Sequence, residues 1–105
     1  MANMEPIKVN HWDVYIKDHP TFIGCLIDKY NDKAWVKNGK WHREDGPAIE
    51  CASGYKAWYQ NGKRHREDGP ACEWSDGDKA WCLKGVKYNE QEWLIAVRRL
   101  KLEEY

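Results

Sequence analysis

Short apolar and aromatic segments alternate with polar, glycine-containing segments through the middle of the chain. The tripeptide KAW begins at Lys33, Lys56 and Lys79, so the pattern returns every 23 residues. Residues 33–55 and 56–78 are identical at 15 of 23 positions, whereas the third copy keeps only its first part. Repetition at a fixed period predicts a stacked array whose terminal copies differ because they face water.

Each unit predicts short antiparallel strands joined by tight turns. Asn-Gly follows the apolar segment in both full units, at 38–39 and 61–62, and it favours a type I′ hairpin because both turn residues need positive φ. Asp-Gly-Pro at 45–47 and 68–70 ends the returning strand, since proline donates no N–H and glycine permits a reversal. The segment ACEW, residues 71–74, predicts the next strand, so successive units continue one meander.

The N-terminal region predicts two further strands. In HWDVYIK, residues 11–17, Trp12, Val14 and Ile16 alternate with polar residues, which is the period of a strand. The segment TFIGCLID, residues 21–28, is also typical of a strand.

The C-terminal region changes to a helical period. Asn89 and Glu92 are spaced for a capping box at the start of a helix over 89–105. Four apolar residues share one face of this helix: Trp93, Ala96, Val97 and Leu100. We expect the helix to fold back on the last hairpin and to cover one face or the open edge, because an uncovered edge strand recruits other chains.

The predicted fold is mainly β, a single-layer antiparallel meander of 23-residue repeats with a C-terminal α-helix. The length of 105 residues fits one domain. Its parts are the N-terminal strands with a degenerate repeat (1–32), the full repeats (33–55 and 56–78), a partial repeat (79–88) and the helix (89–105).

Acidic and basic residues balance at 17 each, which argues against nucleic acid as the main partner because nucleic-acid binders normally carry a basic excess. Seven Trp and six Tyr residues predict a thin, aromatic core, since a large ring buries roughly 150–250 Å². The sequence has no apolar run near the ~20 residues of a membrane span and begins without a signal-peptide segment. We expect no membrane contact and a cytoplasmic protein, in the host cytoplasm if it is viral.

The cysteines are predicted to be buried, reduced thiols. Cys25, Cys51, Cys72 and Cys82 include no close pair of the C-x₂-C type that zinc sites favour. Three of them replace apolar strand residues of another repeat unit. We therefore expect no metal site and no cofactor.

The segment HREDGPA is the densest polar motif and occurs twice. It places a histidine near two acids in each unit: His42 with Glu44 and Asp45, and His65 with Glu67 and Asp68. Such a set could supply an acid–base pair or part of a metal site. A catalytic site needs one constellation, whereas stacked units bring equivalent residues side by side, where Arg and Glu can pair across strands for about 0.2–1 kcal/mol each. We interpret the segment as a repeated joint and expect no catalytic residue.

The tryptophans at the start of each unit are predicted to form a ladder on one face of the sheet, opposite a row of alanines. The predicted structural positions of the repeat are Trp35, Trp58, Trp81, Gly39, Gly62, Asp45, Asp68, Pro47 and Pro70. These positions account for the repeat without assigning it a chemical role.

Part of the aromatic surface is a candidate partner site, because exposed apolar patches mark contact sites and Trp, Tyr and Arg are enriched at binding hot spots. Trp41 is the first candidate, since it replaces Arg64 of the next unit in a polar connector that does not call for a ring. The predicted partner-binding residues are Trp41, Arg43, Arg64, Arg66, Trp74 and Tyr88.

In both full units Trp is followed, after two variable residues, by Asn-Gly-Lys-x-His-Arg-Glu-Asp-Gly-Pro-Ala, over 35–48 and 58–71, and NEQEW stands at 89–93. This pattern resembles the variant form of the MORN repeat family over residues 23–93. Similar units occur in small proteins of bacteria and large phages, often closed by an acidic helix. The resemblance implies a hairpin-repeat fold and an interaction role, as an antitoxin or an inhibitor in host defence evasion, without catalytic residues.

The function that these patterns favour is non-enzymatic protein binding, with a host defence enzyme or a toxin as the partner and inhibition as the outcome. The protein is expected to be a monomer or a homodimer paired through a sheet edge. One alternative is a nucleic-acid or nucleotide binder that uses Trp stacking and rows of Lys and Arg. Another is a small hydrolase built on His65 and Asp68.

Overall fold

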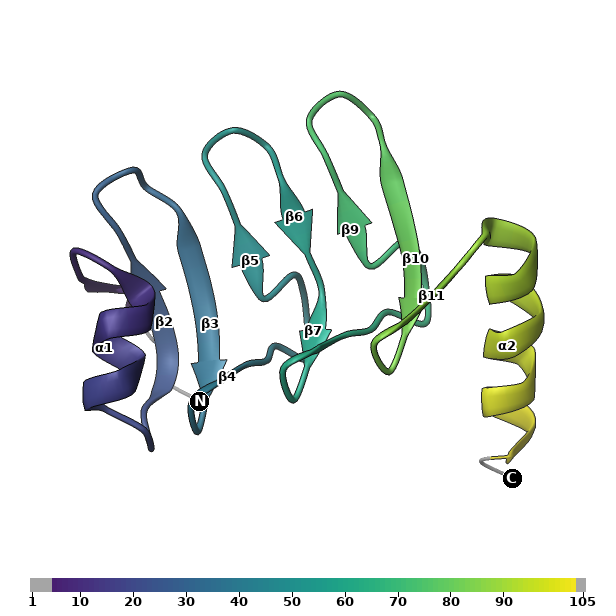
Figure 1. The fold of residues 1–105 in the computed structure, drawn as a ribbon, viewed down its shortest axis with the longest axis horizontal. Helices are drawn as coiled ribbons and strands as arrows, with labels where there is room; N and C mark the ends of the chain where they lie inside the picture. The colour runs from purple at the N-terminus through teal and green to yellow at the C-terminus, as the bar shows by residue number, and fades with distance from the viewer. Residues whose placement is uncertain (1–4, 104–105) are drawn as a thin grey trace.

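The computed structural model describes residues 5–103 and consists of a row of hairpins with a helix at each end (Figure 1). The main sheet has nine strands and is antiparallel except for one parallel pair at its N-terminal edge. This confirms the predicted mainly β fold with a C-terminal helix.

The strands follow one another across the sheet almost in chain order. The main path is β1 (Ile7–Lys8), β2 (Ile23–Ile27), β3 (Lys33–Lys37), β5 (Ile49–Glu50), β6 (Lys56–Ala57), β9 (Cys72–Glu73), β10 (Lys79–Leu83) and β11 (Val86–Tyr88). The other elements are β4 (Lys40–Trp41), which pairs with β3, the β7 (Tyr59–Gln60) and β8 (Lys63–Arg64) hairpin, and the helices α1 (Trp12–Asp18) and α2 (Glu90–Glu103).

Two rows of paired residues cross the repeats, one on each face. The buried row is Ala34, Ile49, Ala57, Cys72 and Ala80. The second row alternates in charge and consists of Lys33, Glu50, Lys56, Glu73 and Lys79. We call the face of the first row the alanine face, and the face that also carries Trp35, Trp58 and Trp81 the tryptophan face. Opposite charges on neighbouring strands contribute about 0.2–1 kcal/mol per pair.

The tight turns at the lower end of the sheet in Figure 1 have the predicted backbone. Asn61 and Gly62 have φ values of 52° and 81°, and the turn at 38–39 has the same pair of signs. The third turn places Lys84 at φ 50° before Gly85 at 85°. The type I′ geometry, with two positive φ values in succession, is therefore kept where the Asn-Gly sequence is lost.

The strand predicted over 11–17 is wrong, because this segment forms helix α1. Trp12, Tyr15 and Ile16, at helical spacing, pack against the buried cluster of β2 and β3. Val14, which the alternation assigned to the core, is 56 % exposed. A segment this short fits both periods, and packing against the alanine face decides between them.

Helix α2 has the predicted capping box and the predicted place. The Glu92 N–H donates to Asn89 Oδ1 at 2.8 Å, and the Asn89 N–H donates to Glu92 Oε1 at 3.3 Å. Trp93 and Val97 are buried against Leu83 of the last hairpin. The helix thus covers the tryptophan face at the C-terminal end, whereas α1 covers the alanine face at the other end.

Helix α2 also supplies a contact that the last repeat unit cannot make. Within the array, Gln60 Nε2 donates to the Arg43 carbonyl at 2.8 Å. Leu83 stands at the position of Gln60 in the last unit and has no side-chain donor. The Trp93 indole Nε1 instead donates to the Arg66 carbonyl at 3.1 Å. The helix therefore provides the hydrogen bond to the Arg66 carbonyl that Leu83 cannot donate.

Candidate functional site

The arginine of HREDGPA is the centre of the motif in each unit. The Arg66 guanidinium lies 3.8 Å from the Trp58 ring centroid. Its Nε donates to Asp68 at 2.9 Å, and its Nη1 donates to the Pro70 carbonyl and to Glu73, each at 3.1 Å. The stacked ring and the three acceptors hold the guanidinium in one orientation.

The first full unit repeats this arrangement. Arg43 lies 3.7 Å from the Trp35 ring centroid and donates to Asp45 at 3.1 Å, to the Pro47 carbonyl at 3.1 Å and to Glu50 at 3.0 Å. Two of the three tryptophans of the predicted ladder, Trp35 and Trp58, thus carry an arginine over the ring. Arg43 and Arg66, both predicted to bind a partner, are engaged within the fold.

The glycine of HREDGPA leaves room for this arginine. A Cβ built on Gly69 would lie 2.8 Å from the Arg66 Cζ, and one on Gly46 would lie 3.0 Å from the Arg43 Cζ. Neither glycine has a positive φ, so close approach rather than backbone conformation accounts for them. The motif therefore closes around its own arginine.

The two histidines link successive hairpins. His42 Nδ1 accepts the Asn61 N–H at 2.9 Å, and His65 Nδ1 accepts the Lys84 N–H at 2.9 Å. In the first hairpin the Phe22 carbonyl accepts the equivalent N–H, from residue 38. The histidines occupy equivalent positions, which supports the interpretation of the segment as a joint.

The second ring nitrogens of the histidines differ. Because His65 Nδ1 is an acceptor, its Nε2 carries the proton and donates to Glu67 at 3.0 Å. His42 Nε2 is buried and has no hydrogen-bond partner within residues 5–103, and the Glu44 carboxylate lies 3.9 Å away. Asp68, the proposed hydrolase partner of His65, pairs instead with Arg66.

The predicted partner-binding residues divide between the two faces of the sheet. Trp41 and Arg64 pair with Val36 and Tyr59 on the alanine face. Trp74 also lies on the alanine face. The other three predicted residues lie on the tryptophan face: Arg43, Arg66 and Tyr88. One flat partner surface cannot contact all six.

Trp41 contributes to the core, so the expectation that its connector does not need a ring is wrong. The side chain packs against two buried clusters, one around Ala34 and one around Ala57. Its ring meets Tyr59 edge-on, with centroids 5.2 Å apart. Arg64 occupies the equivalent position one unit later.

Trp74 is the predicted aromatic residue that stays on the surface, with 40 % of its area exposed. Its ring centroid lies 5.4 Å from that of Tyr55, whose hydroxyl donates to Cys72 Sγ at 3.7 Å. Burial raises the pKa of Tyr55 well above its ordinary value, and the bond to Cys72 adds to the shift. The hydroxyl therefore stays protonated beneath Trp74.

Arg64 lies on the same face of the sheet, beside Tyr59. Its Nε donates to the Tyr59 hydroxyl at 3.2 Å, and this bond raises the pKa of Arg64 above its ordinary value. The guanidinium is close enough to Tyr55 to lower the pKa of its hydroxyl, against the larger effect of burial. We call Tyr55, Trp74 and Arg64 the Trp74 patch.

Tyr88 borders a different surface. It pairs with Trp81 and lines an open groove of about 440 Å³ between β11 and α2. Val86 and Ile95 contribute exposed apolar side chains to this groove. The sequence pattern did not predict the groove, because it forms only where the helix meets the last hairpin.

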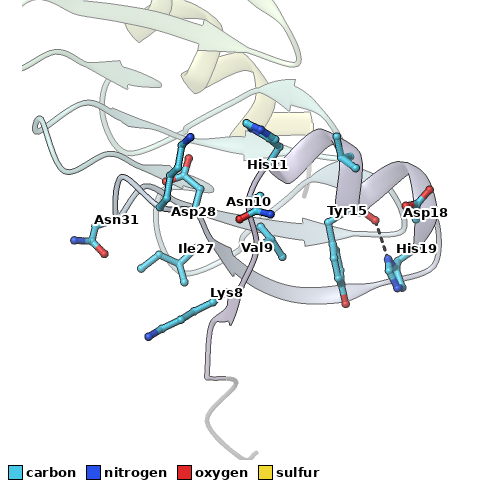
Figure 2. Close-up of a pocket in the computed structure, with 12 residues that line it drawn as sticks. Lys8, Val9, Asn10, His11, Tyr15, Asp18, His19, Ile27, Asp28 and Asn31 are labelled. Atoms are coloured by element: carbon cyan, nitrogen blue, oxygen red, sulfur yellow. Dashed lines mark hydrogen bonds between the residues drawn. The ribbon is translucent and has the colours of Figure 1, made fainter.

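An open cavity of about 760 Å³ lies between α1, β1 and the end of β2 (Figure 2). His19 stacks on Tyr15 with centroids 4.0 Å apart and donates from Nδ1 to the Tyr15 carbonyl at 2.9 Å. Asp28 Oδ1 accepts two backbone N–H groups of its own turn, from Tyr30 and Asp32. These contacts are local, and the cavity was not predicted because α1 was not.

The cysteines are free thiols, and burial raises the pKa of Cys25, Cys51 and Cys82. Over residues 5–103 the structure brings no three His, Cys, Asp or Glu side chains together as metal ligands. Neither helix described here has the length and apolar character to cross a bilayer. Comparisons with protein-family models, curated proteins and solved structures gave no match to the chain.

Proposed function

We propose that this chain is a non-enzymatic protein-binding module that contacts its partner through the Trp74 patch. The carrying observation is the large Trp74 ring, partly exposed yet braced by Tyr55 over the buried alanine row. A rigid ring loses little conformational freedom on binding, and Trp, Tyr and Arg are the side chains enriched at binding hot spots. Arg64 supplies the charged member of this set.

The arrangement of the polar motifs supports the same proposal. The arginines of both HREDGPA segments donate hydrogen bonds to acceptors within the protein. The histidines accept hydrogen bonds from the next hairpin. The Trp74 patch, by contrast, keeps a partly exposed ring and an exposed arginine that can contact a partner. The partner that we propose is a host defence enzyme or a toxin whose activity the complex inhibits, as the resemblance to variant MORN repeats implies.

Affinity capture with a matched pair of variants tests this proposal. Trp74→Ala removes the central ring, and Val14→Ala removes an exposed apolar side chain at the other end of the molecule. We expect the wild type and Val14→Ala to retain the same partner, and Trp74→Ala to bind it at least about 30-fold more weakly. The purified partner is then assayed for activity with each variant.

Three results would contradict the proposal. Equal capture of the partner by Trp74→Ala would show that the Trp74 patch does not bind it. A captured partner whose activity is unchanged in the complex would show that binding does not inhibit it. Tight, salt-sensitive binding to short oligonucleotides, with no protein partner, would favour the nucleic-acid alternative instead.

A further inference from the structure

The tight turns at the lower end of the sheet carry a row of lysines that form no ion pair within residues 5–103. Five lysines lie in or beside the three turns and are exposed: Lys37, Lys40, Lys63, Lys84 and Lys87. The nearby acids of the repeats pair with Arg43 and Arg66 instead, so charge that balances over the whole chain does not balance at the turns.

Stacking of the turns orders part of this row. A Cβ built on Gly62 would lie 3.6 Å from the stem of Lys40, and one on Gly85 would lie 3.6 Å from the stem of Lys63. Each lysine stem therefore runs along the backbone of the next turn. Lys40, Lys63 and Lys84 together line one open depression of about 500 Å³.

The spacing of two of these charges follows from the sheet, because Lys40 and Lys63 occupy equivalent positions of successive units, whereas Lys84 stands at the position of Asn61. Each repeat unit adds two strands to the sheet order, and neighbouring strands lie about 4.8 Å apart, so equivalent turns are separated by roughly 9.6 Å. An extended peptide advances about 3.3 Å per residue, so every third side chain recurs at roughly 10 Å. The two periods match closely.

We call the depression lined by Lys40, Lys63 and Lys84 the lysine groove. We propose that it binds an extended acidic protein segment with a carboxylate at about every third residue. Gln60 and Asn61 also line the groove and can serve the peptide backbone, whereas Glu67 lies at its wall in a bond to His65. No Phe, Tyr or Trp among residues 5–103 lines the depression, and its one imidazole, His65, is already bonded to Lys84 and Glu67. Most binders of single-stranded nucleic acid instead use aromatic rings that are free to stack on the bases.

Fluorescence anisotropy with two labelled peptides tests the proposal. One peptide has glutamate at every third residue with serine between, and its isomer has the same glutamates in one consecutive run. The test variant is the triple substitution Lys40→Gln, Lys63→Gln and Lys84→Gln. The control variant has the same net charge and carries Lys8→Gln, Lys29→Gln and Lys101→Gln, all at exposed positions.

We expect the spaced peptide to bind more tightly than its isomer, because only its carboxylates match the spacing of the turns. Binding is measured at low salt, because exposed charges farther apart than the Debye length, about 10 Å at 0.1 M, are largely screened. The test variant should lose roughly 3- to 100-fold in affinity, the combined effect of three exposed ion pairs, and the control variant should not. Trp74→Ala should bind the spaced peptide like the wild type, which separates this surface from the Trp74 patch.

Equal binding of the two peptides, or an equal loss in the control variant, would show attraction by charge alone and overturn the proposal. Absence of binding would do the same. Tighter binding of an oligonucleotide of equal charge would assign the groove to nucleic acid. Thermal denaturation of each variant checks folding, and Lys63→Gln alone gives the smaller, same-direction loss if the triple variant is unstable.

Discussion

Because Gly69 lies close to the Arg66 guanidinium, we predict that Gly69→Ala destabilises the protein. An added methyl group would lie 2.8 Å from the Arg66 Cζ, inside van der Waals contact. The guanidinium cannot yield freely, because Trp58 and three acceptors hold it. We expect the substitution to lower the free energy of unfolding by about 1–3 kcal/mol, the usual cost of an added group in a filled site.

A double-mutant cycle isolates this cause. Arg66→Ala alone should cost about 2–4 kcal/mol, because it removes the ring stacking and leaves the Pro70 carbonyl without a donor. In that background Gly69→Ala should be neutral, or stabilising by about 0.4–1 kcal/mol through the unfolded chain. The two changes should therefore couple by at least about 1 kcal/mol.

Urea denaturation at equilibrium measures all four members of the cycle. The equivalent change in the first unit, Gly46→Ala, meets its arginine at 3.0 Å and should cost less than Gly69→Ala. If the two changes at Gly69 and Arg66 add within about 0.5 kcal/mol, the glycine is not there for the arginine and the reasoning is refuted.

Three further predictions follow from the helices and the thiols. Trp93→Phe keeps the ring but leaves the Arg66 carbonyl without its donor, which should cost about 1–3 kcal/mol and lower the melting temperature by at least about 4 °C; an unchanged melting curve would contradict the capping role. Ile16→Asp should destabilise the protein in urea far more than Val14→Asp, because only Ile16 faces the core; equal effects would favour a strand over 11–17. Burial raises the pKa of the Cys82 thiol above its ordinary 9.0, so the folded state holds a proton that the unfolded state releases. The contribution of Cys82 to stability should then be constant well below pH 9 and should decrease as the pH rises through 9 toward the raised pKa. Cys82→Ala should make the fall shallower without abolishing it, because burial also raises the pKa of Cys25 and Cys51.

The repeat was the most informative part of the sequence. Its period, the Asn-Gly turns and the capping box of α2 are local patterns, and each fixes backbone conformation without knowledge of distant neighbours. These patterns predicted the meander and the C-terminal helix.

The features that sequence reasoning missed depend on distant contacts. Helix α1 was missed because Trp12 and Ile16 fit both a strand and a helix, and only its contact with β2 and β3 selects the helix. Trp41 was taken for a surface ring because its neighbour Tyr59 lies one unit away. The stacking of Arg43 over Trp35 likewise joins residues whose proximity the spacing does not reveal.

The hydrogen bonds between units have a consequence for the length of the array. The Gly62 N–H donates to the Trp41 carbonyl at 2.8 Å, and the Gly85 N–H donates to the Arg64 carbonyl at 2.9 Å. Both boundaries between units thus use the same donor and acceptor positions. A duplicate of residues 56–78 placed before Lys79 would therefore find matching hydrogen-bond partners in the unit before it and in the unit after it. Such a chain would grow by roughly 9.6 Å and keep its terminal helix as the lid, which makes this architecture extensible by simple gene duplication.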